Sequence, residues 1–139
     1  MPDANIARKS EFISVEIAIK TNHESDAFVK WFEDQDNHVA KIASDPHKWY
    51  IYFAPTPSDC ADSTIRNLCE VIQSLPKEVR DAWDMAGHRE FFAGYHVGED
   101  PFCFTEHLTP DTLRSVLELN AGVGFALYPA PDLDDDPEA

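Results

Sequence analysis

The chain has 139 residues, 43% of them apolar, which is enough for one domain with a sizeable core. Its 26 acidic residues outnumber 11 basic ones and leave a net charge of −15. Removing the acidic end of the chain would still leave about −10 on the rest. A surface of this charge repels nucleic acid and anionic membranes and attracts basic proteins. The totals therefore exclude direct nucleic-acid and membrane binding and favour a basic protein partner.

The N-terminal residues and the cysteines indicate the compartment. No apolar run follows the basic pair Arg8-Lys9, and no window approaches the apolar length of a membrane span. The three cysteines contain no CxxC pair, and Cys60 and Cys69 fall too far apart on one expected helix to form a disulfide. We therefore expect a cytoplasmic protein.

The first half of the chain predicts one strand, one helix and a hairpin. Residues 11–20 alternate between apolar and polar side chains, as in a half-buried strand. Residues 21–24 have the spacing of a capping box, and apolar side chains follow, which predicts a short amphipathic helix. Weaker and stronger strand patterns at 39–43 and 48–54 flank an Asp-Pro turn, so these two strands should pair.

The second half predicts three helices and three strands. Apolar residues recur at helical spacing from Ala61 to Leu75, and this stripe places Leu68 in the core. A proline then starts a second helix, which contains Trp83 as a core residue. The remaining predicted elements, in chain order, are strands at 89–97 and 102–108, a helix capped by Thr109-Pro110 that ends near Asn120, and a strand around 123–127.

These elements predict an α+β fold: a two-layer sandwich with a mixed six-stranded sheet and helices on one face. The first six elements have the β-α-β-β-α-β order of a ferredoxin-like core, which a further β-α-β would extend. We expect a flexible N-terminus at 1–10, a single α+β domain at 11–129 and a disordered acidic tail at 130–139. The order of elements resembles that of several uncharacterised bacterial families of small acidic proteins, some of which serve as immunity proteins against toxins, but no diagnostic motif assigns the chain to one of them.

A predicted hairpin raises the question of a catalytic or metal site. If residues 98–101 join strands 89–97 and 102–108, Tyr95 faces Phe104 on a core face that also holds Glu106 as a polar exception. The opposite face then gathers His96, Cys103 and His107, which could form a zinc site or a Cys–His pair. No further cluster supplies a fourth ligand and no Asn or Asp orients the base, so we expect no metal, no cofactor and no catalysis.

The sheet face opposite the helices is the better candidate for function. Its expected outward residues mix large aromatic and small side chains with few charges, a composition typical of protein interfaces. The alternative is that helices, or a second copy of the chain in a homodimer, cover this face and that its aromatics belong to the core. The candidate partner-binding residues on this face are Glu16, Tyr50, Tyr52, Phe92, His96, His107 and Tyr128.

The charge predicts a second component of binding. Five carboxylates near the ends of the second helical layer and the fourth strand are expected to form a clustered negative surface, namely Asp81, Asp84, Glu90, Glu99 and Asp100. The sequence thus predicts a non-enzymatic acidic binding module, an immunity protein or inhibitor that neutralises a basic toxin or nucleic-acid-binding protein. The alternative is a small-molecule-binding or catalytic domain with its pocket on the open sheet face, around Tyr50, His96, Cys103 and His107.

Overall fold

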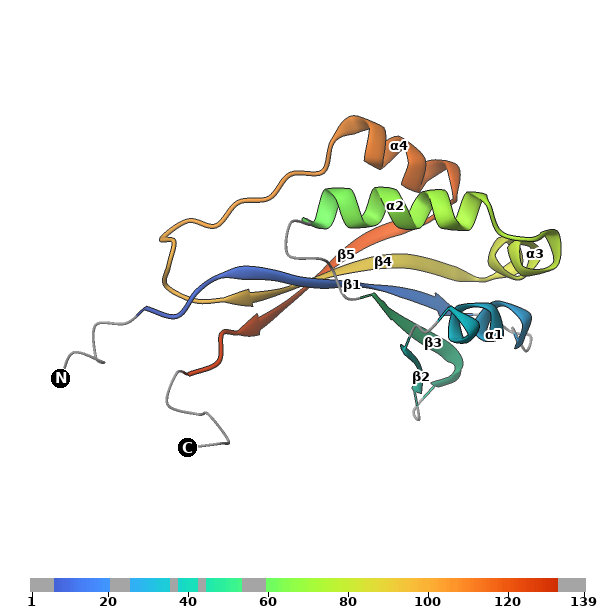
Figure 1. Cartoon of the computed structure of the whole chain (residues 1–139), viewed down its shortest axis with the longest axis horizontal. Helices are drawn as coiled ribbons and strands as arrows, with labels where there is room; N and C mark the ends of the chain where they lie inside the picture. Colours follow the sequence, from blue (N-terminus) through green and yellow to red (C-terminus); the bar gives the residue numbers. More distant parts are fainter. Residues whose placement is uncertain (1–6, 21–25, 36–37, 43–44, 54–59, 133–139) are drawn as a thin grey trace.

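The computed structural model describes residues 7–20, 26–35, 38–42, 45–53 and 60–132 as an α+β fold. The described strands form one sheet, and four helices accompany them (Figure 1). In chain order the elements are β1 (Glu11–Lys20), α1 (Asp26–Asp34), β2 (His38–Ile42), β3 (Asp45–Phe53), α2 (Ala61–Gln73), α3 (Lys77–Met85), β4 (His88–Val97), α4 (Pro110–Glu118) and β5 (Gly122–Pro129).

The sheet has five strands in the order β2-β3-β1-β4-β5. β1 is antiparallel to β3 and β4, and β2 is antiparallel to β3, so the predicted hairpin of β2 and β3 is confirmed. β5 is parallel to β4, which makes β1, β4 and β5 a three-stranded mixed unit at the centre and edge of the sheet. A parallel neighbour needs a long crossover connection, and residues 98–121, which include α4, supply it.

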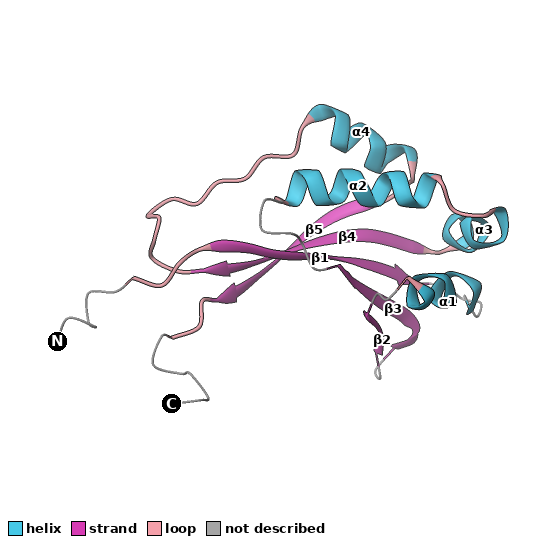
Figure 2. Ribbon diagram, viewed as in Figure 1, coloured by secondary structure: helices cyan, strands magenta, loops and turns pink. Residues whose placement is uncertain are grey.

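The predicted six-stranded sheet is wrong by one strand. Residues 102–108 alternate like a strand, yet in the structure they run as an extended connection without a ladder (Figure 2). The reason is that β1 and β5 occupy both edges of β4, which leaves no edge of β4 for a hairpin partner. The Tyr95 and Phe104 rings nevertheless lie 6.0 Å apart, and the Tyr95 hydroxyl donates a 2.8 Å hydrogen bond to Glu106.

The core lies between the helices and one face of the sheet. Val15, Ile17 and Ile19 of β1 point into it and are fully buried. Residues from all four helices join the same cluster, including Leu68 and Trp83, so the predicted core positions of these two residues are confirmed. The Trp83 indole donates a 3.1 Å hydrogen bond from Nε1 to the carbonyl of Leu119, which satisfies its buried N–H.

A buried carboxylate joins the N-terminal ends of α2 and α4. Asp62, which is 6% exposed, accepts hydrogen bonds from the Thr109 backbone N–H at 2.8 Å and the Thr109 hydroxyl at 3.2 Å, and it pairs with Arg66. Thr109 is itself the predicted N-cap, whose hydroxyl accepts from the N–H of Thr112 at 3.4 Å. Burial alone would raise the pKa of Asp62, but hydrogen bonds from Thr109, Thr112 and Arg66 outweigh it and lower the pKa.

Both ends of the described chain contact the domain. Ser10 donates its N–H to the carbonyl of Asp100 at 2.8 Å, and Ala130 donates its N–H to Val97 at 3.0 Å. Arg8 pairs with Glu99 and reaches Asp132 at 3.3 Å. Residues 7–10 and 130–132 are thus held to the ends of β4 and β5, and the rest of the predicted flexible N-terminus and acidic tail lies outside the described residues.

None of the helices in the described part of the chain is long and apolar enough to cross a bilayer.

Candidate functional site

The register of three strands defines the sheet face that points away from the helices, here called the open face. Glu16 of β1 lies opposite Phe92 of β4, and Phe92 lies beside Gly124 of β5. The alternation of each strand then places Gly94 and Tyr128 on the same side. These residues of β1, β4 and β5 are among the outward residues that the sequence predicts. They point outward because the apolar residues that alternate with them face the helices.

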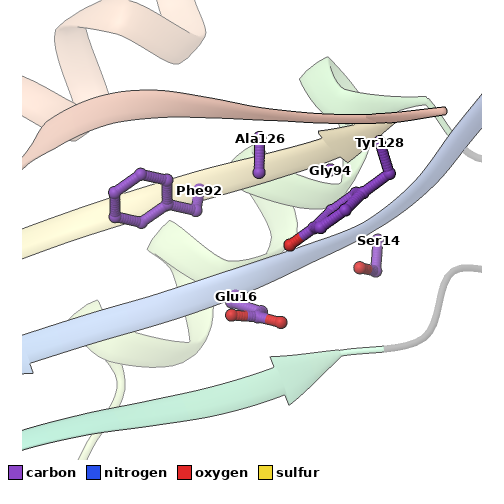
Figure 3. A pocket seen from close by; sticks show the side chains of 6 residues that line it. All are labelled: Ser14, Glu16, Phe92, Gly94, Ala126 and Tyr128. Atoms are coloured by element: carbon purple, nitrogen blue, oxygen red, sulfur yellow. The ribbon is translucent and has the colours of Figure 1, made fainter. Parts of the chain in front are cut away.

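A shallow hollow of about 310 Å³ lies in the open face across these three strands. Its lining residues are Ser14, Glu16, Phe92, Gly94, Ala126 and Tyr128 (Figure 3). The two smallest lining residues, Gly94 and Ala126, lie between the two aromatic side chains. The Tyr128 ring extends across β4, with its hydroxyl toward the side of Glu16 and Ser14. The hollow therefore has a small-residue floor, two aromatic walls and a polar side on β1.

Two glycines shape this hollow in different ways. A Cβ at Gly124 would lie 2.6 Å from the Phe92 ring, so the absence of a side chain lets this ring lie against β5. A Cβ at Gly94 would lie 3.7 Å from Ser14 and 3.9 Å from the Tyr128 ring, which is ordinary contact. Gly94 is therefore a position where a side chain fits but would fill the hollow.

Glu16 is the charged group of the hollow. It lies on the central strand and is half-buried, and burial raises the pKa of its carboxyl because the charged form is partly desolvated. None of the six lining residues that the structure describes is basic. Within the described part of the chain, no hydrogen bond or ion pair compensates the Glu16 carboxylate. Among its described lining residues, the hollow therefore holds one carboxylate and no counter-ion.

The other expected residues of the open face lie beside the hollow. His96 lies next to Tyr128 in the β4–β5 register, and its Nδ1 is 3.3 Å from Glu11 Oε1. The backbones of Tyr50 and Tyr52 pair with β1, Tyr52 directly opposite Glu16. The side chains of these two tyrosines lie outside the described residues.

The predicted grouping of His96, Cys103 and His107 is wrong. It depends on a hairpin ladder that does not form, and Cys103 and His107 lie exposed in the extended connection. Cys103 Sγ instead lies 3.6 Å from the Thr105 hydroxyl. Cys69, by contrast, is buried in α2, where burial raises the pKa of its thiol to about 11. The described residues contain no group of three or more His, Cys, Asp or Glu side chains that could hold a metal ion.

The five expected surface carboxylates do not form one cluster. Asp81 and Asp84 are on α3, which precedes β4, whereas Glu99 and Asp100 follow its far end (Figure 1). Three of the five have basic partners within the described residues: Asp81 with Lys77, Asp84 with Arg80, and Glu99 with Arg8.

Local contacts change the electrostatics of these carboxylates. Hydrogen bonds from the Arg8 side chain and backbone lower the pKa of Glu99 to about 2. Glu90 is the member of the five that lies on β4, with its Oε1 3.7 Å from His88 Nε2. Of the expected charges, only Glu90 and Glu16 lie on the sheet strands that form the open face.

Sequence reasoning missed an apolar surface on the other side of β5. Phe102 is fully exposed, and Phe125 and Leu127 are 58% and 67% exposed. With Tyr95 and Phe104 they line a second hollow of about 380 Å³ between the extended connection and β5. The sequence predicts a strand around 123–127 from its apolar alternation, but no local signal shows that Phe125 and Leu127 are exposed.

Searches of protein-family models, curated proteins and solved structures for similarity to this chain find no match.

Proposed function

We propose that the protein is a non-enzymatic binding module that docks a basic protein on the open face of its sheet. The observation that carries this proposal is the hollow of the open face, with aromatic walls and the half-buried carboxylate of Glu16, for which the described residues supply no counter-ion. A face that only met water would be expected to carry solvated Lys, Glu and Thr side chains. The net charge of −15 supports a basic partner, because it steers such a protein toward the surface.

The exposed apolar residues beside β5 add to this support. Phe102, Phe125 and Leu127 form an apolar patch next to the edge strand of the sheet. Contiguous exposed apolar side chains of this kind mark protein interaction surfaces in soluble proteins. The module thus has two surfaces suited to a protein partner, one acidic and one apolar, on opposite sides of β5.

The proposal extends to the kind of partner and to the finer class of the fold. The partner is a toxin or a nucleic-acid-binding protein, which the acidic chain neutralises as an immunity protein or inhibitor, because such partners are basic. The first six elements form a ferredoxin-like unit, for which the strand order β2-β3-β1-β4 and its antiparallel pairings are the support.

The test compares partner capture by the wild-type chain and by Tyr128→Ala, which removes one wall of the hollow. We expect the wild type to retain a basic protein that the variant loses. Leu117→Ala is the matched control, because Leu117 on α4 is also exposed and apolar but lies in the helical layer. Stopped-flow association with that partner should slow markedly between low and physiological salt. Equal retention by Tyr128→Ala, an acidic partner or a salt-independent association rate would contradict the proposal.

The second candidate function is a small-molecule site in the same hollow. Its volume of about 310 Å³ favours this candidate, since it reaches the lower end of the range for ligand pockets. The capture experiment separates the two functions. A chain that retains no protein but co-purifies with a metabolite, lost in Tyr128→Ala, would have the second function.

A further inference from the structure

The Glu16 carboxylate is half-buried, and it has no hydrogen-bond or ion-pair partner among the side chains that the structure describes. Burial is the cause of its raised pKa, and within the described residues no donor offsets this desolvation. Two other acids of the described chain do have partners: Asp62 accepts hydrogen bonds from Thr109, and Glu11 lies beside His96. A desolvated carboxylate is costly unless a cation or hydrogen-bond donors satisfy it. A bound cation would supply such a partner.

The aromatic walls of the hollow also suit a cation, in addition to the Glu16 carboxylate on β1. Aromatic ring faces attract cations through their quadrupole, and Phe92 and Tyr128 flank the space next to Glu16 (Figure 3). Gly94 and Ala126 keep the floor between the rings low, so that a long side chain can enter. Carboxylate and aromatic faces around one cavity thus provide both interactions that a cationic side chain makes.

The geometry points to an arginine. We propose that the hollow is the anchor site for one arginine side chain of the basic protein partner, with Glu16 as its counter-ion and Phe92 and Tyr128 as the rings that flank the guanidinium. Arginine fits better than lysine because its guanidinium is flat, is less strongly hydrated, stacks on aromatic rings and binds a carboxylate through two parallel hydrogen bonds. This inference rests on the proposed function and specifies its central contact.

The first experiment tests the site without the natural partner. A blocked tripeptide, N-acetyl-Gly-Arg-Gly-amide, is titrated into the full chain and followed by amide and ring NMR signals. Shifts should concentrate at the lining residues of the hollow, and the same peptide with neutral citrulline in place of arginine should bind about tenfold more weakly or not at all. Equal binding of the citrulline peptide, or shifts confined to the helical layer, would overturn the proposal.

Two charge-matched variants test the role of Glu16. Glu16→Gln should lower the affinity for the arginine peptide about tenfold. Glu11→Gln removes the same charge from the same strand outside the hollow, and it should change the affinity less than about twofold. Thermal unfolding of both variants verifies that they fold. Equal losses in the two variants would show general charge attraction and overturn the assignment of Glu16 as the counter-ion.

Two further outcomes separate this inference from the proposed function. If the captured basic partner binds Glu16→Gln as tightly as the wild type, the arginine anchor is overturned while protein binding stands. If no basic protein is captured but the arginine peptide binds as described, the anchor chemistry stands and the proposed function fails.

Discussion

Asp62 should contribute more to stability than any other acid described on the helices, because it alone joins two of them while buried. Asp62→Ala removes both hydrogen bonds that Thr109 donates. The Thr109 backbone N–H, which is part-buried, then lacks its acceptor. Hydrogen bonds to charged groups contribute about 1.5–3 kcal/mol each and are not additive, while the half-exposed pair with Arg66 adds less than about 1 kcal/mol. We therefore expect a loss of about 2–4 kcal/mol in the free energy of unfolding.

The assay is urea denaturation of the wild type and Asp62→Ala at pH 7 and at lower pH. Folding lowers the pKa of Asp62, so its contribution to stability is present at neutral pH and is lost as the pH falls through the folded-state pKa. The difference between the two proteins should therefore shrink in acid. Asp111→Ala is the control, because Asp111 also lies in the first turn of a helix but is exposed and forms its described ion pair with Arg114. A loss below about 1 kcal/mol at pH 7, similar to that of the control, would refute the reasoning.

Three other predictions concern the core, the hollow and the end of the chain. Leu68→Ala should cost about 2–5 kcal/mol in urea denaturation as a cavity in the core, and a cost below about 1 kcal/mol would contradict its packing. Gly94→Ala should stabilise the strand by about 0.5–1 kcal/mol and weaken the arginine peptide, because the added methyl fits but fills the hollow. Gly124→Ala should instead destabilise the protein in the same assay, because its methyl would clash with a ring; equal effects of the two substitutions would contradict the geometry. Deleting residues 133–139 should leave the melting temperature within a few degrees, whereas deleting 130–139 should lower it, since Ala130 is buried and hydrogen-bonded to β4.

Local sequence patterns predicted most of the elements, because each element carries its own signal: alternation in a strand, helical spacing of apolar residues, or a capping residue. The alternation of residues 11–20 predicts β1 with its observed bounds, and the apolar stripe around Leu68 predicts α2. Proline at 76 separates α2 from α3, and Thr109 caps α4. These signals operate within one turn or one strand, so no tertiary context is needed to recognise them.

The error at residues 102–108 has the opposite origin. The alternation of Phe102 and Phe104 with polar neighbours satisfies the local rule for a strand, but a strand also needs a free edge. Whether β4 has such an edge depends on β1 and β5, which are distant in sequence.

The candidate site was predicted in part for related reasons. Side chains alternate between the two faces of a strand, and this alternation is visible in the local sequence. The outward positions of Glu16, Phe92 and Tyr128 could therefore be predicted. Their meeting in one hollow depends on the register of three strands and on the parallel direction of β5, neither of which the local pattern contains. His107 was placed with them because the pattern supplied a hairpin that the fold does not have.

Two carboxylates show how the structure separates a stabilising role from a binding role. Asp62 is buried with donors on several sides, and its lowered pKa means that its charge favours folding at neutral pH. Glu16 is half-buried beside aromatic rings without a described donor, and its raised pKa means that its contribution to stability is lost as the pH rises through that pKa. The ionised Glu16 therefore opposes folding under the conditions in which Asp62 supports it. A cation bound in the hollow would offset this cost at the moment of binding.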